Sequence, residues 1–373
     1  MPQPPPDEKA AIHAGCTRFL SFDPPRRAAD WLAGWADSAH VGLALDSYSQ
    51  GPAITQLEHE VAGLLGKEAG LWFPKGIMAQ QAALLVHAGA SGRRVVALHP
   101  KSHLAVDEAD ALQRLAGLTP VRIGPDIRHF SAADLQKIGE PLAAVTLELP
   151  LRRAGYQALD WDELSAISDW ARQRGVMFHL DGARLWEVQP WVDRPLSEIA
   201  GLADSVYVSL YKGLGGLGGC VLAGSAALIE AAKPWRLRFG GDLPCAFPMI
   251  ISALDGLRNT LPLMGEYFRH ARAIAQAIEA TPGLRVFPAE PQCNSFQVHF
   301  CAGAEAMQQA ALGLAKERGV WLFGYFAQGL LAETSSAELT IGRATMAWTP
   351  EDIASALVEL HERARTYDAA PAI

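Results

Sequence analysis

Cysteine is scarce in this 373-residue sequence, and its five copies lie far apart. The odd number and the absence of any pair spaced as in a zinc knuckle argue against a disulfide framework, so we expect free thiols in a reducing compartment and no metal site. The glycine-rich stretch 213–229 carries no charged residue but is too short for a comfortable membrane span. The first residues, MPQPPPDEK, lack the apolar segment of a signal peptide. We therefore expect a cytoplasmic protein.

Positive charge is in deficit, because 32 Lys and Arg residues stand against 40 Asp and Glu residues, which gives a formal net charge of −8. Nucleic acids and anionic membranes bind clustered positive charge, so this balance disfavours both as partners. Half of the residues are apolar, which excludes a disordered chain. The length favours two domains.

Short β-rich runs recur along the first two thirds of the chain, with helical patterns between most of them. They stand at 70–73, 94–99, 120–124, 143–149, 176–181, 205–210 and 219–224. This alternation is typical of an α/β domain with a largely parallel sheet, and the missing helix between the last two runs predicts one antiparallel strand.

The pattern changes near residue 250, where a long helical stretch at about 247–281 leads into a strand–helix–strand segment. This change predicts a second, smaller α+β domain. We therefore expect an N-terminal arm or helix at 1–45, a large domain at 46–255 and a small domain at 256–373.

Chemically useful residues follow several of the predicted strands, and ligands of such sheets bind at the carboxyl ends of the strands. Lys75-Gly76-Ile77 leads from the first run into a helix, whose N-terminus can bind an anion. His103 follows the second run, Asp181 the fifth and Lys212 the sixth. A lysine that forms a Schiff base and a carboxylate that keeps a ring nitrogen protonated are what pyridoxal phosphate requires. His103 would then stack on the ring, and the turn at Gly76 would take the phosphate.

Two segments, in this order, resemble the low-specificity threonine aldolases, which belong to the β-eliminating lyase branch of the fold-type I pyridoxal phosphate enzymes. HLDGAR at 179–184 resembles their H-x-D-G-A-R segment, and KGLG at 212–215 resembles S-K-G-L-G. LEHEVAGLLGKEA at 57–69 is similar to a further family stretch, as is Ser102-His103 followed by Glu108.

The resemblance implies an aspartate aminotransferase-like large domain with a mostly parallel seven-stranded sheet, and a smaller α+β C-terminal domain. It also implies a homodimer or homotetramer with active sites shared between subunits. Catalytic roles fall to Lys212, His103 and Asp181. The expected cofactor-binding residues are Lys75, Gly76, Ile77, His103, Asp181, Arg184, Ser209 and Lys212. Arg184, Arg343 and Tyr48 are expected to bind the substrate.

The sequence departs from the family in two ways that bear on the reaction. The phosphate turn reads Lys75-Gly76-Ile77 instead of S-G-T, and the second active-site histidine is missing, since no histidine stands between His129 and His179. The base for the substrate hydroxyl is then His103, a water molecule, Tyr48 or another residue of the loop 46–52. The resemblance implies retro-aldol cleavage of a β-hydroxy-α-amino acid, such as L-allo-threonine or L-threonine, to glycine and an aldehyde. The alternatives are β-elimination, transamination or side-chain transfer on another amino acid, or a non-enzymatic binding protein with this fold.

Overall fold

The computed structural model describes residues 6–36, 38 and 40–368. They fall into two compact units: residues 27–264 form one unit, and residues 265 onwards join the N-terminal residues up to Arg26 in the other. Among the described residues, no helix is both long and apolar enough to cross a lipid bilayer.

The division differs from the domain boundaries expected from the sequence, which separated an arm at 1–45 and began the small domain at 256. The N-terminal segment belongs with the C-terminal residues because β1 (Arg18–Phe19) pairs in parallel with β11 (Val320–Trp321). Trp348 adds a side-chain contact to this pairing, since its indole N–H donates to the Phe19 carbonyl at 2.8 Å.

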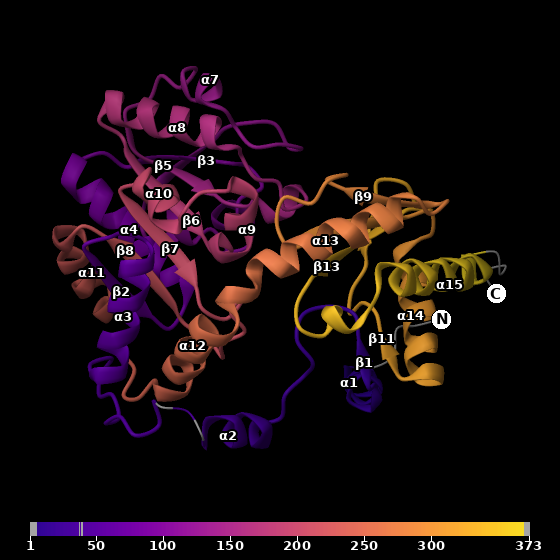
Figure 1. Ribbon diagram of the computed structural model, residues 1–373. Coiled ribbons are helices and arrows are strands. Elements are labelled where there is room, and N and C mark those ends of the chain that lie inside the picture. Colours follow the sequence, from indigo (N-terminus) through magenta and orange to yellow (C-terminus); the bar gives the residue numbers. More distant parts are fainter. Residues whose placement is uncertain (1–5, 37, 39, 369–373) are drawn as a thin grey trace. The chain divides into compact units, whose positions relative to one another are not determined.

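A seven-stranded sheet forms the centre of the unit 27–264 (Figure 1). The strand order is β2-β8-β7-β6-β5-β3-β4, and all neighbours are parallel except β8, which runs antiparallel to β2 and β7. The strands are β2 (Ala69–Phe73), β3 (Val95–Leu98), β4 (Thr119–Arg122), β5 (Leu142–Glu148), β6 (Met177–Gly182), β7 (Ser205–Ser209) and β8 (Cys220–Gly224). The predicted mostly parallel sheet and its antiparallel strand are both confirmed.

Helices follow most strands of this sheet and pack on it. α4 (Gly76–Ser91) contacts β2, β5, β6, β7 and β8, and so crosses the middle of the sheet. The other helices of the unit are α2 (Ala28–Ala36), α3 (Pro52–Leu64), α5 (His103–Val106), α6 (Ala111–Arg114), α7 (Ala132–Leu135), α8 (Trp161–Arg174), α9 (Leu185–Val192), α10 (Leu196–Gly201), α11 (Ala226–Arg238) and α12 (Phe247–Asn259).

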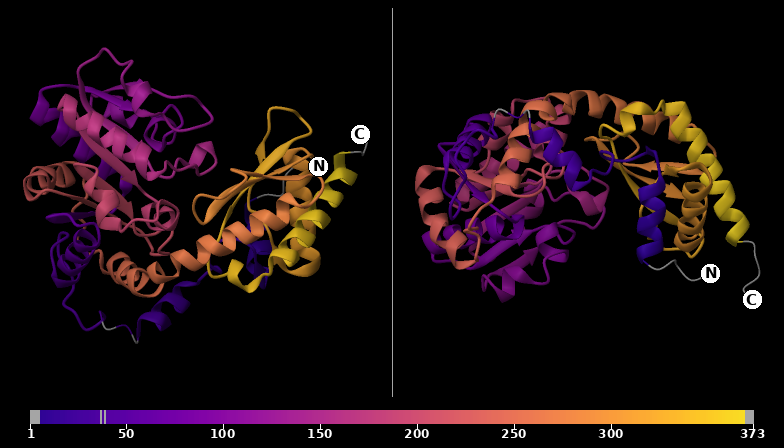
Figure 2. Two further views of the ribbon diagram at one scale, coloured as in Figure 1. Left: turned by 45° about the horizontal axis from the view of Figure 1, so that its top comes forward. Right: turned by 90° about the horizontal axis from the view of Figure 1, so that it is seen from below.

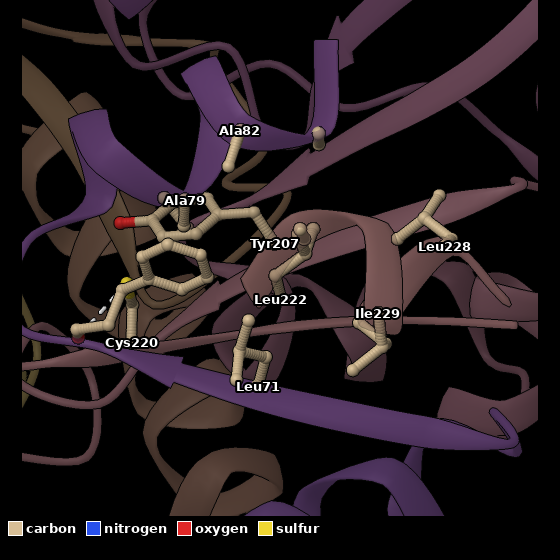
Figure 3. Packing of buried hydrophobic residues seen from close by; sticks show 12 residues of the cluster. Leu71, Ala79, Ala82, Tyr207, Cys220, Leu222, Leu228 and Ile229 are labelled. Carbon is tan, nitrogen blue, oxygen red and sulfur yellow. Dashed lines mark hydrogen bonds between the residues drawn. The ribbon is translucent and has the colours of Figure 1, made fainter. Parts of the chain in front are cut away.

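Small residues on α4 let this helix lie close to the sheet. Ala79, Ala82 and Ala83 are fully buried in one apolar cluster with side chains of β2, β7, β8 and α11. Figure 3 shows the ring of Tyr207, from β7, beside Ala79 in this cluster. Burial of apolar surface contributes about 25 cal/mol per Å² to stability. The packing of these alanines therefore holds α4 against the sheet and keeps its first turn next to the end of β2.

The second unit contains an antiparallel sheet of four strands in the order β12-β13-β10-β9. Its helices α14 and α15 pack against each other, and α14 also contacts β13 (Figure 2). The elements are α1 (Pro6–Gly15), α13 (Met264–Glu279), β9 (Leu284–Phe287), β10 (Ser295–Phe300), α14 (Ala304–Arg318), β12 (Ala327–Gln328), β13 (Ser335–Thr340) and α15 (Pro350–Asp368). This unit confirms the predicted smaller α+β region. The helical stretch predicted at about 247–281 is divided between α12 and α13 by a short 3₁₀ turn at Leu261–Leu263, which contains Pro262.

Candidate active site

A cavity of about 520 Å³ lies at the carboxyl ends of the parallel strands in the unit 27–264. Its walls come from the turn between β2 and α4, the segment around α5, and the ends of β5, β6 and β7. Seven residues predicted for the site line it together: Lys75, Gly76, Ile77, His103, Asp181, Arg184 and Lys212. Parallel strands bring their carboxyl ends to one edge of the sheet, which is why residues so far apart in sequence meet here.

Lys212 follows β7 and lies in the cavity wall, half-buried. Burial lowers the pKa of its amine, while the nearby carboxylate of Asp181 opposes that shift. A lowered pKa increases the neutral fraction of the amine, which is the form that attacks a carbonyl carbon. Glycine at the next position leaves room for Glu187, because a Cβ at Gly213 would lie 2.3 Å from the carboxyl carbon of Glu187 and would displace that side chain.

Asp181 lies one residue before the end of β6, where it is buried and lines the cavity. Its Oδ2 accepts a hydrogen bond of 2.9 Å from the Gln80 side-chain amide, and its Oδ1 accepts one of 3.1 Å from the Ala183 backbone N–H. Both donors stabilise the ionised carboxylate. The cavity therefore presents two hydrogen-bonded carboxyl oxygens to a cationic group.

The turn Lys75-Gly76-Ile77 opens the 16-residue helix α4 at the cavity wall, and Lys75 occupies the N-cap position but its side chain makes no capping hydrogen bond. A Cβ at Gly76 would lie 2.2 Å from the Tyr207 hydroxyl oxygen, so the backbone reaches this position only as glycine. The helix N-terminus and the ammonium group of Lys75 both favour an anion here. This charge is present although the hydroxyl groups of the family's S-G-T turn are not.

Arg184 lies directly before α9 and is largely buried. Its guanidinium is 3.4 Å from the Glu187 carboxylate and 5.3 Å from the centre of the Tyr156 ring. These contacts fix the side chain at the cavity wall, where a positive charge can bind a carboxylate.

His103 begins α5, and carboxylates surround it. Its Nδ1 is 2.9 Å from Asp107 Oδ2, and its Nε2 is 3.6 Å from Glu108 Oε1. Its backbone N–H donates to Glu148 Oε2 at 2.6 Å. Sequence reasoning assigned no role to Asp107 or Glu148. The four-residue spacing from His103 to Asp107 on a short helix, and the position of Glu148 at the end of β5, were the available signals.

The carboxyl groups around His103 differ strongly in pKa. Hydrogen bonding from Arg153 lowers the pKa of Asp107 to about 2. Burial, and then repulsion by Asp181, raise the pKa of Glu108 to about 8 and that of Glu148 to about 7. Two protonatable carboxyl groups therefore lie in the cavity wall, and both titrate near neutral pH.

Two residues predicted for the site are not part of the cavity lining, and a third belongs to the other unit. The hydroxyl of buried Ser209 donates to the Ala183 carbonyl at 2.7 Å, and Ser209 is not part of the cavity lining among the described residues. Tyr48 is 64% exposed, and its backbone N–H bonds to the Pro244 carbonyl at 3.4 Å, also outside that lining. Arg343 belongs to the other unit, where its backbone N–H donates to Asp23 at 3.2 Å.

The residues that line the cavity suit pyridoxal phosphate. A desolvated lysine, a buried carboxylate with two hydrogen-bond donors and an uncapped helix N-terminus correspond to the aldehyde, the ring nitrogen and the phosphate of that cofactor. The volume of about 520 Å³ lies within the range of small-molecule sites.

Comparisons with known proteins agree with this chemistry. The family model for beta-eliminating lyases matches residues 35–301. The chain is 28% identical over 281 residues to low-specificity L-threonine aldolase 1 of Arabidopsis thaliana, which covers 73% of this chain and 78% of that protein. It is 33% identical over 263 residues to the aldolase vrtJ of Penicillium aethiopicum, covering 68% and 67% of the two chains.

A solved structure from Listeria monocytogenes, provisionally described as an L-allo-threonine aldolase, superimposes with a TM-score of 0.88 and 33% identity. The superposition covers 96% of this chain and 99% of that one. The sequence resemblance is thereby confirmed, and with it the fold-type I architecture. The chain belongs to the beta-eliminating lyase family and is a pyridoxal phosphate-dependent lyase.

Proposed function

We propose that this enzyme cleaves a β-hydroxy-α-amino acid of the L-allo-threonine or L-threonine type to glycine and an aldehyde. The observation that carries the proposal is the convergence of Lys212, Asp181 and His103 on one cavity. The names of its relatives in Arabidopsis and Listeria point to the same reaction.

Three residues of the cavity have definite tasks in this reaction: Lys212, Asp181 and Arg184. Pyridoxal phosphate, when bound, supplies an acceptor for the electron pair released at the substrate Cα. Lys212 would provide the amine that holds the cofactor, and Asp181 would provide the carboxylate that keeps a proton on its ring nitrogen. Arg184 binds the substrate carboxylate and orients the Cα–Cβ bond, with its own position fixed by Glu187.

The hydroxyl proton of the substrate needs a base, and His103 is our candidate. Its side chain is 41% exposed and lines the cavity, so a substrate can reach it. The Asp107 carboxylate faces Nδ1 at 2.9 Å and favours the tautomer with its proton on that atom. Nε2 then carries the lone pair, and a positioned base of this kind contributes about 10²–10⁴-fold in rate.

A different pyridoxal phosphate reaction is the second candidate. The missing second histidine favours it, because retro-aldol cleavage needs a base near the hydroxyl and β-elimination needs a leaving group on Cβ instead. An amino-acid panel distinguishes the two reactions by their products. Glycine and an aldehyde support cleavage, whereas a keto acid and ammonia support elimination.

We propose further that the enzyme is a cytoplasmic homodimer or homotetramer. The side chains of Leu32, Val41 and Leu45 are at least half exposed beside an apolar hollow of about 300 Å³, which suits an interface with another copy. All five cysteines are free thiols, which are common in proteins of reducing compartments. Light scattering on the purified protein would give the mass of the assembly, and a monomer would contradict the proposal.

The test of the main proposal compares the wild type with Lys212→Ala in the presence of L-allo-threonine. The wild type should show the visible absorption of a lysine-bound cofactor and release glycine with an aldehyde. Lys212→Ala should lose both, while the control Lys137→Ala, a substitution on the exposed surface, should keep both. A wild-type enzyme that releases no glycine from any threonine isomer would contradict the proposed substrate class.

A further inference from the structure

Glu108 is a carboxyl group of the cavity wall that the reaction described above does not use. Its side chain is only 2% exposed, and its Oε1 has no hydrogen-bond partner among the described residues. Its Oε2 accepts only a long bond of 3.4 Å from the Gln81 amide. A buried polar atom without a partner costs about 1–3 kcal/mol, so Glu108 calls for an explanation.

The nearest basic atom to this carboxyl group is Nε2 of His103, at 3.6 Å. The other ring nitrogen of His103 faces Asp107, which Arg153 holds in turn through a hydrogen bond of 3.0 Å. Asp107 is therefore a permanent acceptor for Nδ1–H, and Nε2 is left as the atom that gains or loses a proton. His103 thus lies between one carboxylate that stays ionised and one carboxyl group that can change its state.

We propose that Glu108 is a positioning residue that acts through His103 and controls whether Nε2 can accept the substrate's hydroxyl proton. When Glu108 is a carboxylic acid, it donates to Nε2 and occupies the lone pair. When Glu108 is a carboxylate, Nε2 is open, and the Nε2–H that forms during cleavage donates to Glu108. This inference rests on the proposed function, because the hydroxyl group belongs to the proposed substrate.

The proton and electron balance closes without a further reactant. The O–H bond of the substrate breaks and an N–H bond forms at Nε2, while the O–H electron pair becomes the second bond of the aldehyde carbonyl. The pair of the broken Cα–Cβ bond stays with Cα. In the net reaction the hydroxyl proton replaces Cβ on Cα, which gives glycine.

The charges around Glu108 set the pH at which this control operates. Asp107 and His103 face it from its own segment, Asp181 from β6, and Tyr207 and Lys212 from β7 and the residues after it. Burial and the charge of Asp181 raise the pKa of Glu108 to about 8, while Lys212 opposes this. The carboxylate form, and with it kcat, should increase as the pH passes through this value.

The first experiment measures kcat and KM for L-allo-threonine from mildly acidic to alkaline pH in the wild type, Glu108→Gln and Glu108→Asp. The Gln amide donates to Nε2 at every pH, so we expect kcat at alkaline pH to fall about tenfold or more, with little change in KM. The rise of kcat with pH should disappear in Glu108→Gln and return in Glu108→Asp. The matched control is Glu58→Gln. Glu58 lies outside the cavity lining, and its largely buried carboxyl group accepts a hydrogen bond from the backbone N–H of Trp72.

The second readout does not depend on turnover. Infrared difference spectra of the full chain, with and without cofactor, follow the carbonyl stretch of protonated carboxyl groups as the pH rises. A band with a midpoint near 8 should be absent from Glu108→Gln and present in Glu148→Gln. These spectra also test the variants independently of their activity.

The outcomes separate this inference from the proposed function. A wild type that releases no glycine contradicts both. A wild type that cleaves the substrate, together with a Glu108→Gln enzyme that keeps the rise of kcat with pH, contradicts the role of Glu108 alone. The absence of the infrared band in the wild type contradicts that role as well.

Discussion

Two clusters of polar side chains lie near Asp181, and they differ in what they can do. The cavity cluster consists of His103, Glu108, Glu148 and Lys212, which line an open space. The inner cluster consists of His87, His179 and Ser205, which are fully buried between α4 and the sheet. Gln80 joins the inner cluster to Asp181, because its amide N–H donates to Asp181 Oδ2 and its Oε1 lies 3.4 Å from His179 Nε2.

The hydrogen bonds of the inner cluster run in a single direction. Gln80 Oε1 accepts from His179 Nε2–H, so His179 Nδ1 must accept from the Ser205 hydroxyl at 2.8 Å. Ser205 Oγ can then accept from His87 Nε2–H at 2.7 Å. Every group has its partner, and burial lowers the pKa of His87 to about 4 and that of His179 to about 3. These histidines stay neutral at physiological pH.

The inner cluster positions Asp181, whereas the cavity cluster can exchange protons. In the inner cluster, complete pairing and full burial fix one protonation state and hold Asp181 in place. In the cavity cluster, burial and then repulsion by Asp181 raise the pKa of Glu108 to about 8 and that of Glu148 to about 7. Perturbed pKa values near neutrality are typical of groups that exchange protons with a substrate.

The largest effect should come from cutting the link between the clusters with Gln80→Met. Methionine keeps the volume but leaves Asp181 Oδ2 and His179 Nε2 without their partner. Because one of these atoms is charged, we expect a loss of about 2–4 kcal/mol in the free energy of unfolding and weaker cofactor binding. The control is Gln56→Met on the exposed face of α3, where a 2.7 Å bond to Glu60 is lost at a cost below about 0.5 kcal/mol. Equal losses in the two variants would show that Gln80 does not support Asp181.

A smaller effect should follow from Ser205→Ala, which interrupts the inner cluster one step further from Asp181. His179 Nδ1 and His87 Nε2 then lose their shared partner, at a cost of about 1–2 kcal/mol. The cofactor should still bind, since Gln80 and Asp181 keep their bond. Ser165→Ala removes a hydroxyl that bonds only within α8 and is the control for both urea unfolding and cofactor titration. Loss of the cofactor in Ser205→Ala would place the inner cluster among the binding determinants.

The residues that sequence analysis could locate are those that directly follow strands. Asp181 lies at the end of β6 and Lys212 follows β7, so the parallel sheet alone brings them to one edge. Gly76 was recognisable because a glycine turn precedes a helix. The strand order of the sheet could not be predicted, because the spacing of the β-rich runs along the sequence does not indicate that β8 lies between β2 and β7.

The remaining contacts depend on packing that the sequence does not display. Gln80 faces Asp181 across 101 positions only because the alanines of α4 bring this helix onto the sheet. Glu108 stood in a recognised segment, but its burial comes from the fold around α5. Tyr48 is turned outwards because the backbone N–H groups of Tyr48 and Ser49 bond to the carbonyls of Pro244 and Leu243. In each case a tertiary contact decides where the side chain lies.

The smallest and most specific effect concerns the pH dependence of stability. The folded-state pKa of His87, about 4, lies below the ordinary value of 6.5, so between these values the unfolded chain binds more protons at this site. The stability that His87 contributes is fully present above pH 6.5 and is lost as the pH falls towards 4. Glu108 has the opposite sign, because its raised pKa makes the folded state bind more protons between about 4.5 and 8, and stability from it decreases as the pH rises.

His87→Gln isolates this term, since the amide can still donate to Ser205 but no longer titrates. The free energy of unfolding of the wild type, measured with urea, should decrease as the pH falls below 6.5. Each buried neutral histidine contributes a slope of up to about 1.4 kcal/mol per pH unit. In His87→Gln this slope should be smaller by the contribution of one histidine. At pH 7 the free energies of unfolding of the two proteins should differ little. An unchanged slope would mean that His87 titrates normally in the folded protein. The inner cluster would then not be locked in one protonation state, and its contrast with the cavity cluster would fail.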